Sequence, residues 1–266
     1  MLDLENRVMH VYWAELLDML ESAAPPDVAR ALDLGAGSGT GTFGMLDRFA
    51  AAQVVAVDMS QPLLDRIVER AASDGVAGRV SALIADLDAS WPDVADVDVA
   101  LASLSLHHVA DPDRVLAELF AALRPGGVVA VAEMTEPPGV LPDDLGLGRP
   151  GLERRMLDLV NAEFKHSLPE LGSDWASRLT AAGFELVDER EIQLDVRAPY
   201  PPELRRFALL WLQRMAGRVR DGLPSDDANV LDALIAEDGP ASVTQRDDLH
   251  VHGSRTVTVA RRPRSA

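Results

Sequence analysis

The sequence predicts an α/β fold built around a parallel sheet. Between residues 30 and 133, short apolar segments alternate with stretches whose apolar residues recur at helical spacing, which is the order of consecutive βαβ units. The apolar segments are continuous rather than alternating, as strands are when helices cover both faces of a sheet. A glycine-rich turn at 35–39 follows the first strand directly. With 266 residues, 47% of them apolar, the chain can bury the core of one such domain.

The N-terminal half supplies most of the predicted sheet. An amphipathic helix is expected first, over residues 3–22, until two consecutive prolines end it. Further helices are expected after the glycine turn, after the capping residue Ser60, and at 111–123. Residues 123–127, Leu-Arg-Pro-Gly-Gly, are expected to form a turn before the fifth strand. The five strands of this half are expected at 30–34, 54–57, 80–85, 97–103 and 128–132.

Beyond residue 133 the regular alternation stops. Prolines and glycines gather at 134–150, which indicates a loop or a lid. A helix is expected at 151–166, and Ser173 is a candidate cap for another helix that ends at Gly183. The remaining pattern predicts a strand at 184–196, helices at 202–220 and 226–236, and a last strand at 256–259.

The charge of the chain argues against two classes of partner. The formal net charge is −18, and Lys165 is the only lysine. Because phosphate contacts need a basic surface, we expect no nucleic-acid partner. The same acidity argues against binding to an anionic membrane surface. A small molecule is the expected partner.

The sequence contains no cysteine, and its first residues do not have the pattern of a targeting signal. The absence of cysteine excludes disulfides, thiol catalysis and thiolate metal sites. The first residues contain acids and no long apolar run, and no apolar stretch is long enough to span a bilayer. We therefore expect neither a signal peptide nor a transmembrane helix, and a cytoplasmic location.

Two nucleotide-binding patterns compete for the glycine turn. A strand, a glycine turn and a helix start together make a site for an anionic group, because glycine lets the backbone approach a ligand closely. A dinucleotide site requires G-x-G-x-x-G directly after the strand, and from Gly35 this pattern fails at Thr40. It matches at Gly39, Gly41 and Gly44, but there it begins too late and lies within the expected helix.

The segment that does follow the strand reads D-x-G-x-G-x-G, from Asp33 to Gly39. This pattern resembles motif I of the class I S-adenosylmethionine-dependent methyltransferases. The resemblance covers residues 28–133, and five matches in register favour that family more strongly than any single one. The four further matches are Asp58 after the second strand, Ala85-Asp86-Leu87 after the third, residues 101–109 after the fourth, and residues 123–127 before the fifth.

The resemblance implies a role for each residue of a cofactor site. Asp58 would hold the two ribose hydroxyls of S-adenosylmethionine, since an ionised carboxylate can accept from both, and Met59 would lie against the adenine. Asp86, or Asp88 in its place, would accept from the adenine amino group beside Leu87. The other residues implied in cofactor binding are Asp33, Gly35, Ala36, Gly37, Gly39 and Ser103.

Simpler roles stay open for the three acids. Asp58 could cap the following helix, and Asp86 could be a solvated loop residue. Asp33 could orient the glycine turn without touching a ligand.

His107 and His108, after the fourth strand, are the candidate catalytic residues. An imidazole titrates near neutral pH, so either could act as a general base, although turn packing is the alternative role. No other histidine or acid lies at ligand spacing from them, so no metal site is expected. His250 and His252 are expected at the surface.

Aromatic residues give a weaker indication of a substrate site. In the family that this sequence resembles, the N-terminal helix often covers the cofactor pocket, which makes Tyr12 and Trp13 candidate substrate contacts. Packing in the core is the alternative. Trp175 and Trp211 are expected in the core of helical segments.

The resemblance completes the fold prediction. It implies a three-layer Rossmann-like methyltransferase fold with seven strands in the order 3-2-1-4-5-7-6, mostly parallel, the last strand antiparallel. We expect one domain over 1–266, with an N-terminal helical cover at 1–28 and a cofactor-binding core at 28–133. An inserted helical cap over the substrate would come from 134–170 and 197–253.

The predicted function is methyl transfer from S-adenosylmethionine to an O, N or C nucleophile of a small molecule, with S-adenosylhomocysteine as product. Alignment in a closed site can supply most of the acceleration, so no dedicated base is obligatory. An NAD-dependent oxidoreductase and a non-catalytic S-adenosylmethionine-binding protein are the alternatives.

Overall fold

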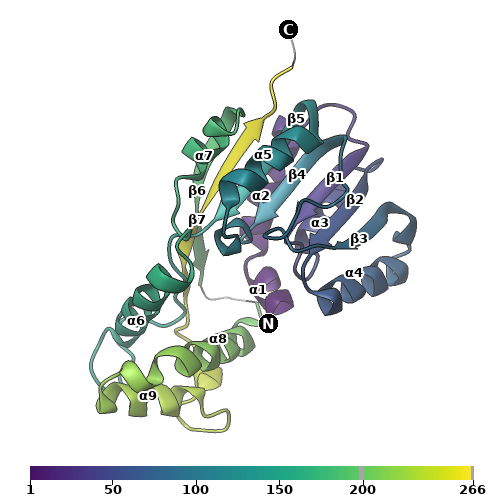
Figure 1. The fold of residues 1–266 in the computed structure, drawn as a ribbon. Helices are drawn as coiled ribbons and strands as arrows, with labels where there is room; N and C mark the ends of the chain where they lie inside the picture. Colours follow the sequence, from purple (N-terminus) through teal and green to yellow (C-terminus); the bar gives the residue numbers. More distant parts are fainter. Residues whose placement is uncertain (198–200, 265–266) are drawn as a thin grey trace. The chain divides into compact units, whose positions relative to one another are not determined.

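The computed structural model describes residues 1–197 and 201–264 and confirms the α/β class. Its strands form one mixed sheet, and Figure 1 labels them with the helices. The strands are β1 Arg30–Leu34, β2 Gln53–Asp58, β3 Val80–Ile84, β4 Val97–Ser103, β5 Leu123–Glu133, β6 Glu185–Val196 and β7 Val251–Arg261. The helices are α1 Leu2–Val8, α2 His10–Ala23, α3 Thr40–Arg48, α4 Gln61–Ser73, α5 Pro112–Ala122, α6 Leu152–Ser167, α7 Trp175–Ala181, α8 Leu204–Val219 and α9 Ser225–Ile235.

The strand order is β3-β2-β1-β4-β5-β7-β6, as predicted. Strands β1 to β5 pair in parallel, and β7 pairs with β5 in the antiparallel direction. The parallel strands therefore end at one common edge of the sheet. In α/β folds this carboxyl edge is where ligands bind.

Two local predictions are wrong at element boundaries. The single helix expected at 3–22 is two helices, because the backbone leaves the helical conformation at Met9 (ψ 28°). The turn expected at 123–127 is part of β5, whose register against β4 shifts between Val97 and Val99. The extra residues of β5 at this shift form a bulge, and Gly126, with φ +86°, lies within it.

Side chains of β1 show which helices cover each face of the sheet. Leu32 and Leu34 belong to one buried apolar cluster with residues of α5 and α7. Since neighbouring residues of a strand point to opposite faces, Asp33 points to the other face. There it contacts Thr42 of α3. Figure 1 shows the sheet with α5 running along it.

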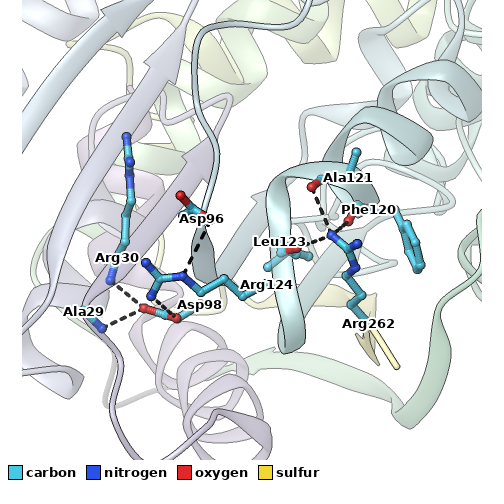
Figure 2. Close-up of polar contacts among 9 residues, drawn as sticks. All are labelled: Ala29, Arg30, Asp96, Asp98, Phe120, Ala121, Leu123, Arg124 and Arg262. Atoms are coloured by element: carbon cyan, nitrogen blue, oxygen red, sulfur yellow. Dashed lines mark hydrogen bonds and ion pairs between the residues drawn. The ribbon is translucent and has the colours of Figure 1, made fainter. Parts of the chain in front are cut away.

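Polar side chains fix the amino-terminal end of β4 (Figure 2). The buried carboxylate of Asp98 accepts the backbone N–H groups of Ala29 and Arg30, each at 2.9 Å, and an N–H of Arg124 at 3.0 Å. These bonds join the start of β1 to β4 and β5. A buried carboxylate with three donors is well satisfied.

Arg262 closes the carboxyl end of α5, as Figure 2 also shows. Its guanidinium donates to the backbone oxygens of Phe120, Ala121 and Leu123. The last carbonyls of a helix have no partner within the helix and carry the negative end of its dipole. A cation at that place therefore stabilises the helix end.

The described residues divide into two compact units. The sheet unit comprises Val11–Met134, Gly172–Ile192 and the chain from Arg255 onward. The helical unit comprises Met1–His10, Thr135–Leu171 and Gln193–Ser254. Residues 198–200 of the predicted cap segment 197–253 lie outside the described residues. No helix in the part of the chain that the structure describes is long and apolar enough to cross a bilayer.

In the helical unit, α8 packs against α1, α6 and α9. Asp227 of α9 is buried and accepts two hydrogen bonds from each of two guanidinium groups, those of Arg149 and Arg155. These hydrogen bonds hold the pKa of the Asp227 carboxyl well below its usual range. The contact fastens the segment around 149–155 to α9.

A second buried carboxylate, that of Glu153, holds the backbone at residues 140 and 141. Glu153 accepts the backbone N–H groups of Val140 and Leu141. Its Oε2 lies 3.2 Å from Nε2 of His252, a half-exposed residue of β7. The Glu153 hydrogen bond raises the pKa of His252 above its usual value, against the opposing effects of partial burial and Arg154.

Candidate functional site

The glycine turn after β1 has the backbone that only glycine adopts easily. Gly35, Gly37 and Gly39 have φ values of +71°, +54° and +85°, and Gly39 is the N-cap residue of α3. The N–H groups of Gly35 and Ala36 donate to the carbonyl of Val57, at 2.8 and 2.9 Å. The turn is thereby held against the end of β2.

Gly35 is required by space as well as by conformation. A Cβ at this position would lie 2.4 Å from the Cβ of Ser105, in the segment after β4. Ser105 is fixed there, because its hydroxyl donates to the carbonyl of Leu34 at 2.8 Å. The chain thus brings the ends of β1 and β4 together at a position without a side chain.

Gly41 and Gly44, which completed the competing dinucleotide pattern, lie inside α3. A Cβ at Gly41 would lie 2.7 Å from Leu101 and 2.9 Å from a carboxylate oxygen of Asp33, and one at Gly44 would lie 2.4 Å from Leu17. These glycines allow α3 to pack closely on its neighbours. This packing role explains why glycines stand at these positions, and no bound dinucleotide is needed to explain them.

Asp33 is buried beside this helix. Its Oδ2 accepts the hydroxyl of Thr42 at 2.7 Å. Burial raises the pKa of Asp33 to about 6, while the bonds from Thr42 oppose the shift and the charge of Asp58 adds a little to it. Asp33 therefore connects β1 to α3 below the glycine turn.

Asp58, at the end of β2, contacts the glycine turn directly. Its Oδ2 accepts the N–H of Gly37 at 2.8 Å, and its Oδ1 accepts the N–H of Ser60 at 2.8 Å. The side chain of Ser60 makes no capping bond to α4. The half-buried carboxylate of Asp58 keeps free lone pairs on both oxygens.

Two large apolar side chains are exposed beside Asp58. Met59 follows it and is 72% exposed, and Ile84, which pairs with Asp58 in the sheet register, is 55% exposed. Sequence reasoning selected Met59 and missed Ile84. Ile84 could have been found as the residue that ends the strand next to Asp58.

The segment after β3 is held by its own acids. The exposed Asp86 accepts the N–H of Asp88 at 2.9 Å, and Asp88 accepts the N–H of Ala110 at 2.7 Å. The carbonyl of Leu87 accepts from the guanidinium of Arg114. Asp86 and Leu87 are thus placed at the carboxyl edge of the sheet, and Asp88 ties this segment to the loop before α5.

Tyr12 and Ser103 meet at the end of β4. The Tyr12 hydroxyl lies 3.2 Å from the Ser103 hydroxyl, and the Tyr12 ring is buried. Trp13 is half-buried, and its ring lies 5.6 Å from that of Tyr12 in an edge-on arrangement. The structure places Tyr12 at the carboxyl edge of the sheet.

His107 is buried, and its neighbour His108 is exposed. Nδ1 of His107 lies 2.5 Å from Oε2 of Glu133, the last residue of β5. Oε1 of Glu133 accepts the backbone N–H groups of Ser105 and Leu106, at 3.1 and 2.9 Å. Glu133 escaped sequence reasoning, although it ends a buried strand as Asp58 does.

The other residues considered in the sequence are not part of the carboxyl edge of the sheet. Trp175 and Trp211 are buried, as expected. His250 and His252 are partly exposed, and each faces a carboxylate, Asp195 and Glu153 respectively. Among the described residues, no group of three histidine, aspartate or glutamate side chains could hold a metal ion.

The candidate residues gather in one unit. Every predicted cofactor, catalytic and substrate residue belongs to the sheet unit. They lie on β1, β2 and β4, in the segments after β1 to β4, and on α2. The arrangement offers backbone donors, carboxylates and an apolar surface to one ligand.

Comparison with known proteins finds methyltransferases among the relatives of this chain. A family model described as a methyltransferase domain matches residues 31–127. The demethylmenaquinone methyltransferase of Clavibacter sepedonicus is 31% identical over 186 residues, which are 66% of this chain and 74% of that protein. The trans-aconitate 2-methyltransferase of Variovorax paradoxus is 34% identical over 115 residues, and this match covers only 43% of the chain and 42% of that protein.

Other comparisons widen the range of relatives. The tRNA 5-carboxymethoxyuridine methyltransferase of Escherichia coli is 33% identical over 122 residues, 46% of either protein. A solved structure from Bacillus halodurans C-125 superposes with a TM-score of 0.59 at 18% identity, covering 94% of this chain and 98% of that one. The structural likeness confirms the fold.

Proposed function

Because the chain belongs to the S-adenosylmethionine-dependent methyltransferase family, we propose that it transfers the methyl group of S-adenosylmethionine to an O, N or C nucleophile of a small molecule. The observation that carries the proposal is the contact of Asp58 with the N–H of Gly37 at 2.8 Å. It places a carboxylate with spare acceptor capacity beside a glycine turn and a helix start. A ligand with hydroxyls and a carboxylate matches both.

The residues around Asp58 fit the rest of the cofactor. Met59 and Ile84 expose apolar surface that the face of an adenine ring could cover. Asp86 is exposed and can accept from an exocyclic amine, while Gly35, Gly37 and Gly39 leave the turn free of side chains. We propose these residues, with Asp33, Ala36, Leu87 and Ser103, as the cofactor site.

When bound, S-adenosylmethionine supplies an electrophilic methyl group on a sulfonium. The chain must then hold a nucleophile in line and, for a hydroxyl, remove its proton. We propose His107 for that proton, because Glu133 occupies its Nδ1 and leaves Nε2 to accept. His108, whose ring centre lies 4.1 Å from that of His107, is the second candidate.

The charge of the chain supports a small-molecule acceptor. A net charge of −18 repels a polyanion, although one relative is a tRNA methyltransferase. Tyr12 and Trp13 are proposed as acceptor contacts from α2, and residues 134–170 and 197–253 as the substrate cap.

The test is methyl transfer from methyl-labelled S-adenosylmethionine to a panel of small metabolites and to bulk tRNA. We expect label in small molecules and none in tRNA, and a rate that falls in His107→Ala when the acceptor is a hydroxyl. Label only in tRNA would contradict the acceptor class. Binding without transfer to any acceptor would favour the non-catalytic alternative.

A further inference from the structure

A cavity of about 540 Å³ lies in the helical unit, along α6. Its volume falls within the range of small-molecule sites. Its lining is mixed in character. The polar lining residues are Thr135, Glu136, Asp158, Asn161 and Lys165, and Phe164, Leu168 and Leu171 contribute apolar surface.

Three of the polar residues form a stripe on α6. Asp158, Asn161 and Lys165 are spaced at i, i+3 and i+7, which places them on one face of a helix. Seven residues of helix separate the two charged positions by about 10 Å along the axis. The cavity therefore presents an anion near one end and a cation near the other.

Within the described part of the chain, these two charges are unpaired. Among the residues that the structure describes, neither Asp158 nor Lys165 makes a hydrogen bond or an ion pair, whereas Glu163 and Arg155 of the same helix both do. Lys165 is moreover the only lysine of the chain. A charge pair held apart across a cavity suits a ligand that carries both opposite charges.

Asn161, between them, has an unsatisfied acceptor. Its Oδ1 is buried and has no hydrogen-bond partner, while its Nδ2 lies 3.5 Å from Oε2 of Glu136. A buried acceptor without a donor is energetically unfavourable, because it has lost water without gaining another partner. A ligand N–H at this place would satisfy it. Glu136 is itself 3.8 Å from the guanidinium of Arg154, so its charge is already partly balanced.

We propose that this cavity binds a small zwitterion. Its ammonium would lie against Asp158 and the Oδ1 of Asn161, its carboxylate against Lys165, and its hydrocarbon part against Phe164 and Leu168. This binding site rests on the cavity alone and goes beyond the proposed function.

Calorimetry on the full chain tests the binding site with a defined probe. ε-Aminocaproate carries both charges on a flexible chain, and hexylamine and hexanoate each carry one. We expect the amino acid to bind at least about tenfold more tightly than either analogue, and its affinity to fall as salt is raised. Equal affinity for the amino acid and one of its single-charge analogues would overturn the proposal.

Variants separate the two ends of the site. Lys165→Met and Asp158→Asn should each weaken ε-aminocaproate about tenfold, and Lys165→Met should leave hexylamine unchanged. Both positions are exposed, so the fold should tolerate the changes. Asp47→Asn, at an exposed aspartate of α3, is the matched control and should bind as wild type does. Unchanged affinity in both cavity variants would overturn the proposal.

S-adenosylhomocysteine, titrated in parallel, separates this proposal from the proposed function. If it binds and ε-aminocaproate does not, the cavity proposal alone fails. If ε-aminocaproate binds and S-adenosylhomocysteine does not, the proposed function fails and the binding site stands.

Discussion

Nδ1 of His107, in the segment after β4, lies 2.5 Å from Oε2 of Glu133, the last residue of β5. Both side chains are only 2% exposed. Glu133 also accepts two backbone N–H groups from the segment before His107. Because the carboxylate accepts at both oxygens, Nδ1 of His107 is the donor. One glutamate thereby fixes the conformation of this segment and the tautomer of its buried histidine.

Replacing Glu133 by Gln should disturb both the conformation of the segment before His107 and the tautomer of His107. The amide has one acceptor oxygen in place of two, so either the backbone N–H groups or the Nδ1–H of His107 loses its acceptor, and the amide N–H2 can bond Nδ1 only in the other tautomer. We expect a loss of about 2–3 kcal/mol in the free energy of unfolding, measured by denaturant titration. Nitrogen NMR of histidine-labelled protein should show His107 protonated at Nδ1 in wild type and in a tautomer mixture in the variant. Glu136→Gln is the control, and an unchanged His107 spectrum in E133Q would contradict the assignment.

Gly35→Ala should be far more damaging than the same change at Gly75. Both glycines have nearly equal φ, +71° and +72°, but a Cβ at Gly75 meets no atom within 4 Å, and one at Gly35 would overlap Ser105. Gly75→Ala should cost only about 1–2 kcal/mol, the conformational term, and Gly35→Ala clearly more. Thermal unfolding gives the comparison. Adding Ser105→Gly should recover part of the loss at Gly35, and equal losses at both glycines would show that Ser105 is not the obstacle.

Asp33 should make the stability of the protein depend on pH. Its folded pKa of about 6 exceeds its usual value of 3.8 because the carboxyl is buried. Below pH 3.8 the Asp33 carboxyl is protonated in both the folded and the unfolded chain. Between pH 3.8 and about 6 only the unfolded chain ionises, so the free energy of unfolding falls as the pH rises through this range. Above about pH 6 the carboxyl is ionised in both states, and this contribution no longer changes with pH. Asp33→Asn should gain up to about 3 kcal/mol relative to wild type between pH 4 and pH 7. A constant difference across that range, as expected for the control Asp47→Asn, would contradict the buried-acid account.

His252 should make the stability of the protein depend on pH in a higher range than Asp33 does. Its pKa is raised by the hydrogen bond to Glu153, so its stabilising contribution is complete below its unfolded pKa, about 6.5, and is lost as pH rises through the higher folded pKa. His252→Gln should flatten this part of the pH profile of unfolding, whereas His10→Gln, at an exposed residue of α2, should not. A profile unchanged in H252Q would contradict the pairing with Glu153.

Much of the sheet and of its edge could be predicted because the signals are local. Each parallel strand is a continuous apolar run, and Asp33, Asp58 and Asp86 stand where a strand passes into a turn. The spacing of the glycines then separated the turn proper from the packing glycines of α3. Such patterns need only the period of the chain and the chemistry of the ends of strands.

The errors and omissions concern contacts between distant segments. Glu133 matters through His107, twenty-six residues earlier in the chain, and neither residue type reveals the other. Ile84 is important only because the sheet register sets it beside Asp58. The bulge in β5 likewise depends on pairing with β4, which the Pro-Gly-Gly composition of the segment conceals as a simple turn.

Calorimetric titration of S-adenosylhomocysteine into wild type, Asp58→Ala and Asp47→Ala tests the cofactor site most directly. In the proposed site Asp58 would accept from both ribose hydroxyls, and a charge-assisted hydrogen bond contributes about 1.5–3 kcal/mol. We therefore expect wild type and Asp47→Ala to bind alike and Asp58→Ala to bind at least about tenfold more weakly, with its fold intact by circular dichroism. No binding by wild type, or equal binding by Asp58→Ala, would contradict the assignment of the site.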